Sequence, residues 1–204
     1  MKIITISREF GSGGRELGKA LADVLGFDYY DSEIMNTVSM KCGLDDKCTE
    51  LSLRDGGWKN IPITFHGTMS SSAYMATFNT DALYRQNNVM KEIASYGRDF
   101  VIVGRNADVI LRDYSPLNIF VYASVETKLK RCIECAKPGE VITERELLRK
   151  FKEIDKSRAK ARELVTESPW GSRESYHLSL STDGWNIEEL AEVLSDYSSR
   201  WFEK

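Results

Sequence analysis

The chain opens, over residues 2–26, with KIITISREFGSGGRELGKALADVLG, which is typical of a strand, a glycine-rich turn and a helix in succession. Residues 2–7 are rich in β-branched side chains without helical spacing, so they predict a buried parallel strand. Three of the four residues 11–14 are glycines, and Leu17 and Leu21 then recur at helical spacing. A helix N-terminus after such a turn directs unpaired backbone N–H groups and a positive partial charge at one point, which favours a phosphate ligand.

Two nucleotide-binding motifs fit this turn imperfectly. The dinucleotide fingerprint G-x-G-x-x-G, counted from Gly11, has Glu16 in place of its last glycine, which disfavours a NAD-dependent oxidoreductase. The triphosphate loop G-x-x-x-x-G-K-[ST], with Gly14 as its second glycine, has Glu9 for the first glycine, Arg15 for the lysine and Glu16 for the hydroxyl residue. A phosphate site is the favoured interpretation, and a tight strand-to-helix turn without a ligand is the alternative.

Composition narrows the class of protein. The 204 residues are 42% hydrophobic and 29% charged, as expected for one soluble domain, and the net charge of -3 argues against a nucleic-acid surface. No apolar run is long enough to span a membrane and no signal-like segment opens the chain, so we expect a cytoplasmic protein without membrane or nucleic-acid partners. The cysteines, at 42, 48, 132 and 135, are not spaced as a zinc site, so we expect reduced thiols and no metal-ligating side chains.

Polar residues follow two further predicted strands. A strand over residues 27–31 ends in Asp31 and is followed by Ser32, and a strand over residues 100–103 is followed by Gly104 and Arg105. Ligands bind at the carboxyl ends of strands in open α/β sheets, which makes these side chains candidate contacts. The alternatives are that Ser32 only caps a helix and that Arg105 bonds a carbonyl or a carboxylate.

The rest of the pattern alternates between strands and helices. We expect strands at 117–122 and, as a half-exposed edge, at 176–181. We expect helices at 70–96, from Ser124 onward, from a capping box at Thr143 and Glu146 to about Leu164, and from Asn186 onward. The last helix is expected to face inward with Ile187, Leu190, Val193, Leu194 and Tyr197.

The helix that follows Thr143 carries a basic stripe that includes Arg158 and, three residues earlier, Asp155. A charged stripe is usually a solvated helix face. The same stripe could close over phosphate groups as a movable basic element.

This order of elements resembles the nucleoside monophosphate kinases, and residues 7–15, SREFGSGGR, are similar to the Ser-Arg-Glu-x-Gly-Ser-Gly-Gly-Arg signature of the cytidylate kinase-like family. The resemblance implies an α/β, P-loop NTPase three-layer fold with a five-stranded parallel sheet over a single domain, residues 1–204. It implies a core of residues 1–31, 100–136 and 176–204, a helical NMP-binding insertion over 32–99 and a helical lid over 137–175.

The resemblance also implies ATP-dependent phosphoryl transfer to a nucleoside monophosphate, most closely CMP or dCMP, with Mg²⁺ and arginines stabilising charge. The residues that would hold the donor phosphates are Gly11, Ser12, Gly13, Gly14, Arg15 and Glu16. Those that would bind the acceptor are Asp31, Ser32, Arg105, Asp155 and Arg158. Those that would act in catalysis are Arg15, Arg105 and Arg158.

The chain departs from the cytidylate kinase pattern at several of these positions. Aligning the first helix places Gly14 at the P-loop lysine, whereas aligning the glycines places Arg15 there. Glu16 stands where Ser or Thr would ligate Mg²⁺, Asn106 replaces the Asp of Gly-Arg-Asp, and Thr37 replaces an arginine of the acceptor site. A nucleotide-binding protein of the same fold with weak or no kinase activity is therefore the alternative function.

Overall fold

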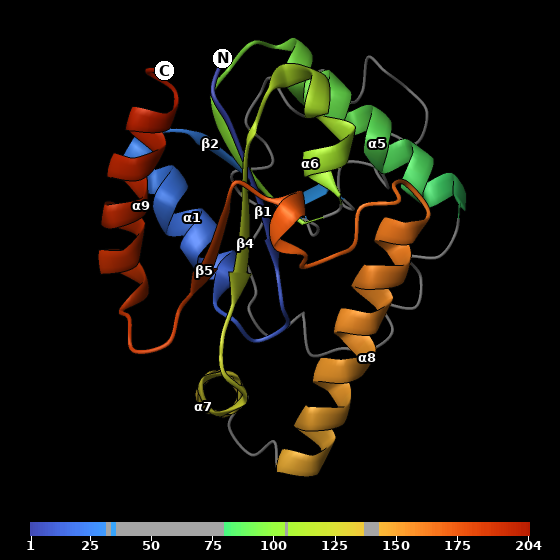
Figure 1. Cartoon of the computed structure of the whole chain (residues 1–204), viewed down its shortest axis with the longest axis vertical. Coiled ribbons are helices and arrows are strands. Elements are labelled where there is room, and N and C mark those ends of the chain that lie inside the picture. Colours follow the sequence, from blue (N-terminus) through green and yellow to red (C-terminus); the bar gives the residue numbers. More distant parts are fainter. Residues whose placement is uncertain (32–33, 36–79, 105, 137–142) are drawn as a thin grey trace.

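The computed structural model describes residues 1–31, 34–35, 80–104, 106–136 and 143–204, which Figure 1 draws in colour. Several features that the sequence singled out lie outside the described residues: Ser32, Thr37, Cys42, Cys48, Arg105, residues 36–79 of the predicted insertion and residues 137–142 of the predicted lid.

The described residues form a five-stranded sheet in which every strand runs parallel to its neighbours. Its strands are β1 (Ile3–Arg8), β2 (Asp28–Asp31), β3 (Phe100–Val103), β4 (Leu117–Tyr122) and β5 (Leu178–Ser181). They pair in the order β2-β3-β1-β4-β5, which confirms the predicted parallel sheet and the edge position of the last strand. Because β1 is central, its carboxyl end is flanked by the ends of both β3 and β4.

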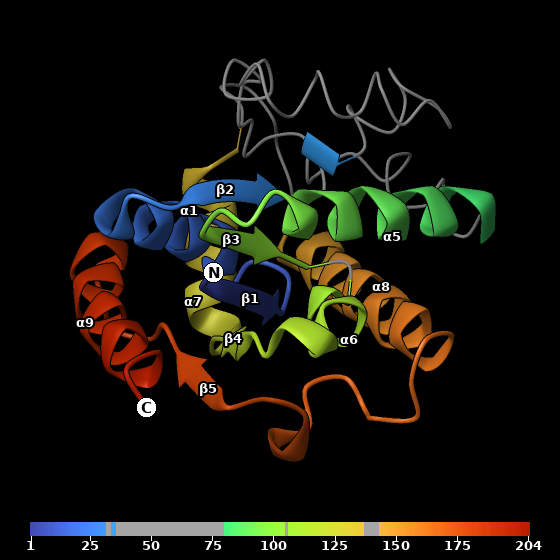
Figure 2. The same ribbon diagram turned by 90° about the horizontal axis from the view of Figure 1, so that it is seen from above.

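Helices cover both faces of this sheet. They are α1 (Gly14–Leu25), α5 (Thr80–Ser95), α6 (Ala107–Ile110), α7 (Val125–Glu134), α8 (Glu144–Glu163) and α9 (Ile187–Trp201), with short 3₁₀ turns η4 (Arg112–Tyr114) and η5 (Arg173–Ser175). Figure 2 shows α1 and α9 on one face and α5, α6 and α8 on the other, so the domain has three layers. In Figure 1, α7 lies beyond the carboxyl end of β4. None of the described helices has the length and apolar character that a membrane span requires.

The core follows from the apolar strands. Ile3, Ile4 and Ile6 of β1 and residues 100–103 of β3 are buried because helices cover both sheet faces. Gly18 brings α1 onto the sheet, since a Cβ at this position would lie 2.5 Å from Cγ2 of Val103. The close packing of α1 fixes where its N-terminus lies relative to the ends of β1 and β3.

Helix caps were predicted better than the buried face of the last helix. The capping box of Thr143 and Glu146 is present, and the Asn186 side chain accepts hydrogen bonds from the first turn of α9. The prediction that Val193 and Tyr197 face inward is wrong, because they are 55% and 37% exposed. The buried residues of α9 are Leu190, Ala191, Leu194 and Ser198. The expected face was chosen from large apolar side chains, so it left out Ala191 and Ser198, which complete the buried face of α9.

Candidate functional site

Residues 9–13 form the turn between β1 and α1, and two of its glycines adopt left-handed conformations. Gly11 has a φ of 74° and Gly13, the N-cap of α1, a φ of 77°. A Cβ on Gly11 would also lie 3.2 Å from Cβ of Lys128 and 3.3 Å from Sγ of Cys132. Gly13 has no side chain to cap α1, so the N–H groups of the first turn are left for another acceptor. These properties match the predicted phosphate-binding turn.

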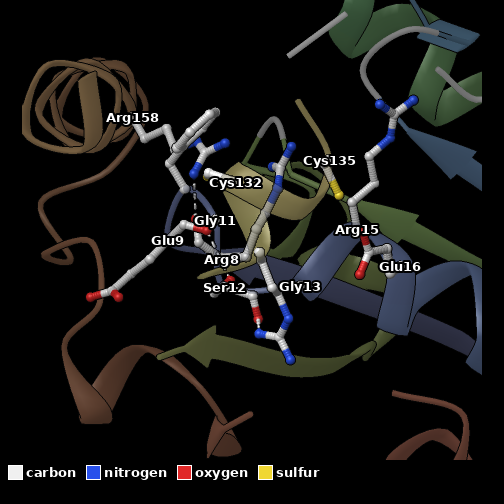
Figure 3. A pocket seen from close by; sticks show the side chains of 13 residues that line it. Arg8, Glu9, Gly11, Ser12, Gly13, Arg15, Glu16, Cys132, Cys135 and Arg158 are labelled. Carbon is white, nitrogen blue, oxygen red and sulfur yellow. Dashed lines mark hydrogen bonds between the residues drawn. The ribbon is translucent and has the colours of Figure 1, made fainter. Parts of the chain in front are cut away.

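A cavity of about 90 Å³ opens against this turn. Figure 3 shows the side chains that line it, among which are residues from β1, α1, α7 and α8. Its charged lining residues are Arg8, Arg15, Arg131, Arg158, Glu9 and Glu16. Four cations against two carboxylates make this cavity suited to an anion.

Helix α8 contacts the turn through the predicted Asp-x-x-Arg pair. The Phe10 N–H donates to Oδ1 of Asp155 at 2.8 Å, and Nη1 of Arg158 donates to the Arg8 carbonyl at 2.9 Å and to Asp155 at 3.1 Å. Burial raises the pKa of the Asp155 carboxyl, although Arg158 opposes this shift. The structure thus brings both α8 residues against the turn, although Asp155 is 145 residues from Phe10 in the sequence.

Arg15 reaches from α1 toward the carboxyl end of β2. Its Nε and Nη2 lie 2.7 and 2.6 Å from Oδ2 of Asp31, whose side chain is buried. The Tyr29 hydroxyl donates to the same oxygen at 3.3 Å, and the Ile34 N–H donates to Oδ1 at 3.0 Å. Burial, followed by the Asp31 charge, raises the pKa of Tyr29. Arg15 and Asp31, both predicted site residues, are therefore bonded to each other.

The carbonyl of Ser12 is held from the other side by α7 and by the residue after β5. It accepts hydrogen bonds from Nη1 of Arg131 at 3.0 Å and from the Thr182 hydroxyl at 2.7 Å. Arg131 also donates to Thr182 at 2.8 Å, and the Ser12 hydroxyl donates to the Glu9 carbonyl at 2.9 Å. The sequence prediction missed Arg131 and Thr182, although the rule of polar residues at strand ends could have found Thr182.

One face of α7 packs on the same turn. Lys128, which is buried, forms an ion pair with the partly exposed Glu9. Cys132 and Cys135 line the cavity as free thiols, as predicted. Burial raises the pKa of Cys132 to about 11 and also raises that of Cys135, so both thiols are protonated at neutral pH. The signal for this face was the spacing of residues 128, 131, 132 and 135, which is that of one helix face.

The first turn of α1 contributes the remaining predicted loop residues. Gly14 is its first residue and Glu16 its third. Burial raises the pKa of Glu16, with Arg131 opposing the shift. Among the described residues, no group of three or more side chains of the types that bind metals is gathered.

The fold is shared with several solved structures, shikimate kinases among them. An uncharacterised protein from Eubacterium ventriosum superposes with a TM-score of 0.71 at 25% identity, covering 98% of this chain and 99% of that one. Shikimate kinase from Bacteroides thetaiotaomicron gives a TM-score of 0.54 at 16% identity, covering 96% and 97% of the two chains. Shikimate kinase from Acinetobacter baumannii in complex with shikimate gives 0.50 at 17% identity, covering 98% and 94%. These similarities show the fold of P-loop kinases.

Sequence comparison gives the family. No curated protein sequence matches the chain. The profile of the cytidylate kinase-like family matches residues 3–184, most of the described turn, sheet and helices among them. Family and fold together support a phosphotransferase in general. The chain therefore belongs to the cytidylate kinase-like family.

Proposed function

We propose that the protein transfers the γ-phosphoryl group of ATP to a nucleoside monophosphate, with CMP and dCMP as the first acceptors to test. The observation that carries this proposal is the anion-suited cavity at the N-terminus of α1, which collects arginines from β1, α1, α7 and α8. A phosphotransferase needs such convergence because its transition state spreads negative charge over phosphoryl oxygens. Membership of the cytidylate kinase-like family supports the choice of acceptor.

The donor phosphates would lie on the turn and on the first turn of α1. Gly11 and Gly13 let a ligand approach the main chain, and the uncapped N–H groups of α1 provide donors for phosphate oxygens. The residues at this site therefore fit the triphosphate of ATP. Mg²⁺ would accompany ATP and neutralise part of its charge. Since the described residues hold no cluster of metal ligands, most of its ligands would be phosphate oxygens and water, with Glu16 as the candidate carboxylate.

Helix α8 would act as the lid. Arg158 already bonds the turn through the Arg8 carbonyl, so its guanidinium is close to where a transferred phosphoryl group would be held. When α8 closes over the substrates it would also exclude water, which strengthens the interaction of Arg158 with the developing charge. Asp155 would help to dock the lid, because it accepts the Phe10 N–H and orients Arg158.

The acceptor would bind near the Arg15–Asp31 pair. Asp31 lies at the carboxyl end of β2 and holds the guanidinium of Arg15 on that side of the cavity. Arg15 would thereby stand between the donor phosphates and the acceptor phosphate. Ser32 and Arg105 remain predicted acceptor contacts from outside the described residues.

The test is ADP formation from Mg-ATP with a panel of acceptors: CMP, dCMP, UMP, AMP, GMP and shikimate. We expect ADP formation above the acceptor-free rate with at least one monophosphate, and fastest with CMP or dCMP. ADP formation with shikimate alone would contradict the choice of acceptor and leave a phosphotransferase. No acceptor-dependent ADP with any compound would contradict the proposed transfer.

A nucleotide-binding protein without transferase activity is the second candidate. It is favoured by the first residue of α1, Gly14, which has no side chain where a lysine would contact the phosphates. Binding of ATP by calorimetry together with no turnover on the panel would support it.

A further inference from the structure

Two glycines on different elements leave room for the same arginine. A Cβ on Gly14, at the start of α1, would lie 2.7 Å from Cβ of Arg8 and 3.1 Å from its Cγ. A Cβ on Gly104, directly after β3, would overlap Nη1 of Arg8 and lie 2.7 Å from its Cζ. The Arg8 side chain therefore occupies the space that side chains at positions 14 and 104 would need.

Arg8 consequently lies along the carboxyl edge of the sheet. It is the last residue of β1, its stem passes the N-terminus of α1, and its guanidinium reaches the end of β3. Figure 3 shows it extending between the side chains of Arg158 and Arg15, and all three line the same cavity. The Arg158 guanidinium is also bonded to the Arg8 carbonyl, so the strand end and the α8 arginine are linked.

Helix α1 itself brings little charge to the turn. A phosphate loop usually places a lysine just inside the helix, where its ammonium meets the β- and γ-phosphates. Here the first helical residue is Gly14, and the next, Arg15, is held by Asp31 at 2.6 and 2.7 Å. Glu16 then adds a carboxylate. Asp31 thus neutralises part of the Arg15 charge, and the other cations that line the cavity, Arg8, Arg131 and Arg158, come from outside α1.

We propose that Arg8 supplies the donor-phosphate cation that phosphate loops usually take from a helical lysine. This inference rests on the proposed function and adds to it the residue that binds the donor. A guanidinium can bond two phosphate oxygens at once, so it can hold a polyphosphate without an ammonium in the same place. The glycines at 14 and 104 then serve the same purpose, because each leaves the space that the Arg8 side chain occupies.

The first experiment compares Arg8→Gln, Arg8→Lys, Arg15→Gln and Arg112→Gln in the full chain. Arg112 provides the charge-matched control, since its side chain is 78% exposed on η4, ahead of the amino end of β4. The probes are a non-hydrolysable ATP analogue (AMP-PNP) with Mg²⁺ and inorganic tripolyphosphate, measured by calorimetry, with thermal unfolding as the check of folding.

We expect Arg8→Gln to weaken binding of both probes by about ten- to a hundredfold, because a hydrogen-bonded charge is lost. Arg8→Lys should recover part of this loss, Arg15→Gln should weaken binding less than Arg8→Gln, and Arg112→Gln should bind as the wild type does. Binding by folded Arg8→Gln within threefold of the wild type would overturn the inference.

If Arg8→Gln does not fold, Gly104→Ala tests the same inference, because this variant keeps the arginine and changes only where its guanidinium can lie. The new methyl group displaces the guanidinium, and Gly97→Ala is the matched control: both glycines have left-handed φ, 84° and 70°, but nothing lies within 4 Å of a Cβ on Gly97. We expect Gly104→Ala, and not Gly97→Ala, to weaken binding of AMP-PNP at least tenfold. Equal binding by the two variants would overturn the inference.

The same measurements distinguish a failure of the Arg8 inference from a failure of the proposed phosphoryl transfer. If the wild type binds AMP-PNP and transfers phosphate while Arg8→Gln is unchanged, only the role of Arg8 fails. If the wild type binds AMP-PNP but phosphorylates no acceptor, the proposed transfer fails and the binding difference still decides the role of Arg8. If the wild type binds neither probe, both are wrong.

Discussion

The turn between β1 and α1 is contacted from two sides, and the two sets of contacts differ in kind. On the side of α7 and β5, Arg131 and the fully buried Thr182 both donate to the carbonyl of Ser12. On the side of α8, Asp155 and Arg158 are 18% and 14% exposed; Asp155 accepts the Phe10 N–H, and Arg158, which lines the cavity, donates to the Arg8 carbonyl. The contacts to the Ser12 carbonyl fix the shape of the turn. In the contacts to α8, a phosphate oxygen could take the place of Asp155 as acceptor for the Phe10 N–H, or of the Arg8 carbonyl as acceptor for Arg158.

Helix α8 is anchored away from the turn as well. Nη1 of Arg162, near its C-terminal end, lies 2.7 Å from Oδ2 of Asp108 in α6, with 2% and 3% of the side chains exposed. Nε of Arg162 donates to the Ser168 carbonyl at 2.7 Å. One end of α8 is thus fixed in the core of the domain, and only its middle contacts the cavity. A lid that opens by pivoting about the Arg162 end agrees with both observations.

Breaking the anchor should give the largest effect on stability. Arg162→Met leaves the buried Asp108 carboxylate without its cation, and such a loss costs about 3–5 kcal/mol. We expect this decrease in the free energy of unfolding from urea titration. Arg173→Met is the control, because its ion pair with Glu174 is 90% and 69% exposed and should contribute almost nothing. Equal stability of the two variants would mean that α8 is not anchored by this pair.

Removing the arginine at the cavity should instead affect catalysis. Arg158→Gln keeps a hydrogen-bond donor but loses the charge, so we expect kcat for phosphoryl transfer to fall by about 10²–10³-fold. The melting temperature should fall by only a few degrees, because the variant loses the bonds to Asp155 and to the Arg8 carbonyl but keeps the rest of the α8 contacts. Lys156→Gln, an exposed residue on the same helix, is the control for a change of charge. A fall confined to KM would assign Arg158 to substrate binding alone.

The other side of the turn can be tested without removing a charge. Thr182→Val keeps the shape of the side chain but removes the donor to Ser12 and the acceptor for Arg131, which should cost about 1–3 kcal/mol of unfolding free energy. Because the Ser12 carbonyl loses one of its two donors, binding of AMP-PNP should also weaken by about three- to tenfold. Thr182→Ser retains the hydroxyl, so it should bind AMP-PNP as the wild type does. Weakened binding by both variants would exclude the hydroxyl as the cause.

The sequence predicted the features whose causes are local. The apolar strands, the glycine turn and the caps at Thr143 and Asn186 depend on residues within a few positions of each other. They depend only on burial, backbone freedom and side-chain capping, so the spacing of residue types along the sequence is sufficient to predict them. The likeness of residues 7–15 to a family signature then implied that these strands form one five-stranded parallel sheet.

The partners of the site residues could not be predicted in the same way. Arg15 was expected on donor phosphates, but the pairing of β2 with β3 and the packing of α1 bring Asp31 within reach of its guanidinium. Arg131 was not singled out from the sequence, because it contacts Ser12 from 119 positions away. The course of Arg8 depends on β3 lying beside β1, which the order of strands along the chain does not show. Contacts of this kind arise only when the sheet is assembled.

The smallest effect should come from the carboxylate that docks α8. Burial raises the pKa of Asp155 above its ordinary 3.8, so the folded protein retains this proton at pH values where the unfolded chain has released it. The contribution of Asp155 to stability is therefore full below pH 3.8 and is lost as the pH rises through the raised pKa. Asp155→Asn keeps an oxygen for the Phe10 N–H but cannot titrate.

The measurement is the free energy of unfolding of wild type minus Asp155→Asn, taken from urea titrations between pH 7 and pH 4. We expect this difference to rise as the pH falls, because protonation removes the cost of burying the charge. Subtraction cancels the other titrating groups, which the two proteins share. A difference that instead falls toward acid would mean that the ion pair with Arg158 outweighs the burial of Asp155, and that charge rather than a protonated carboxyl holds α8 on the turn.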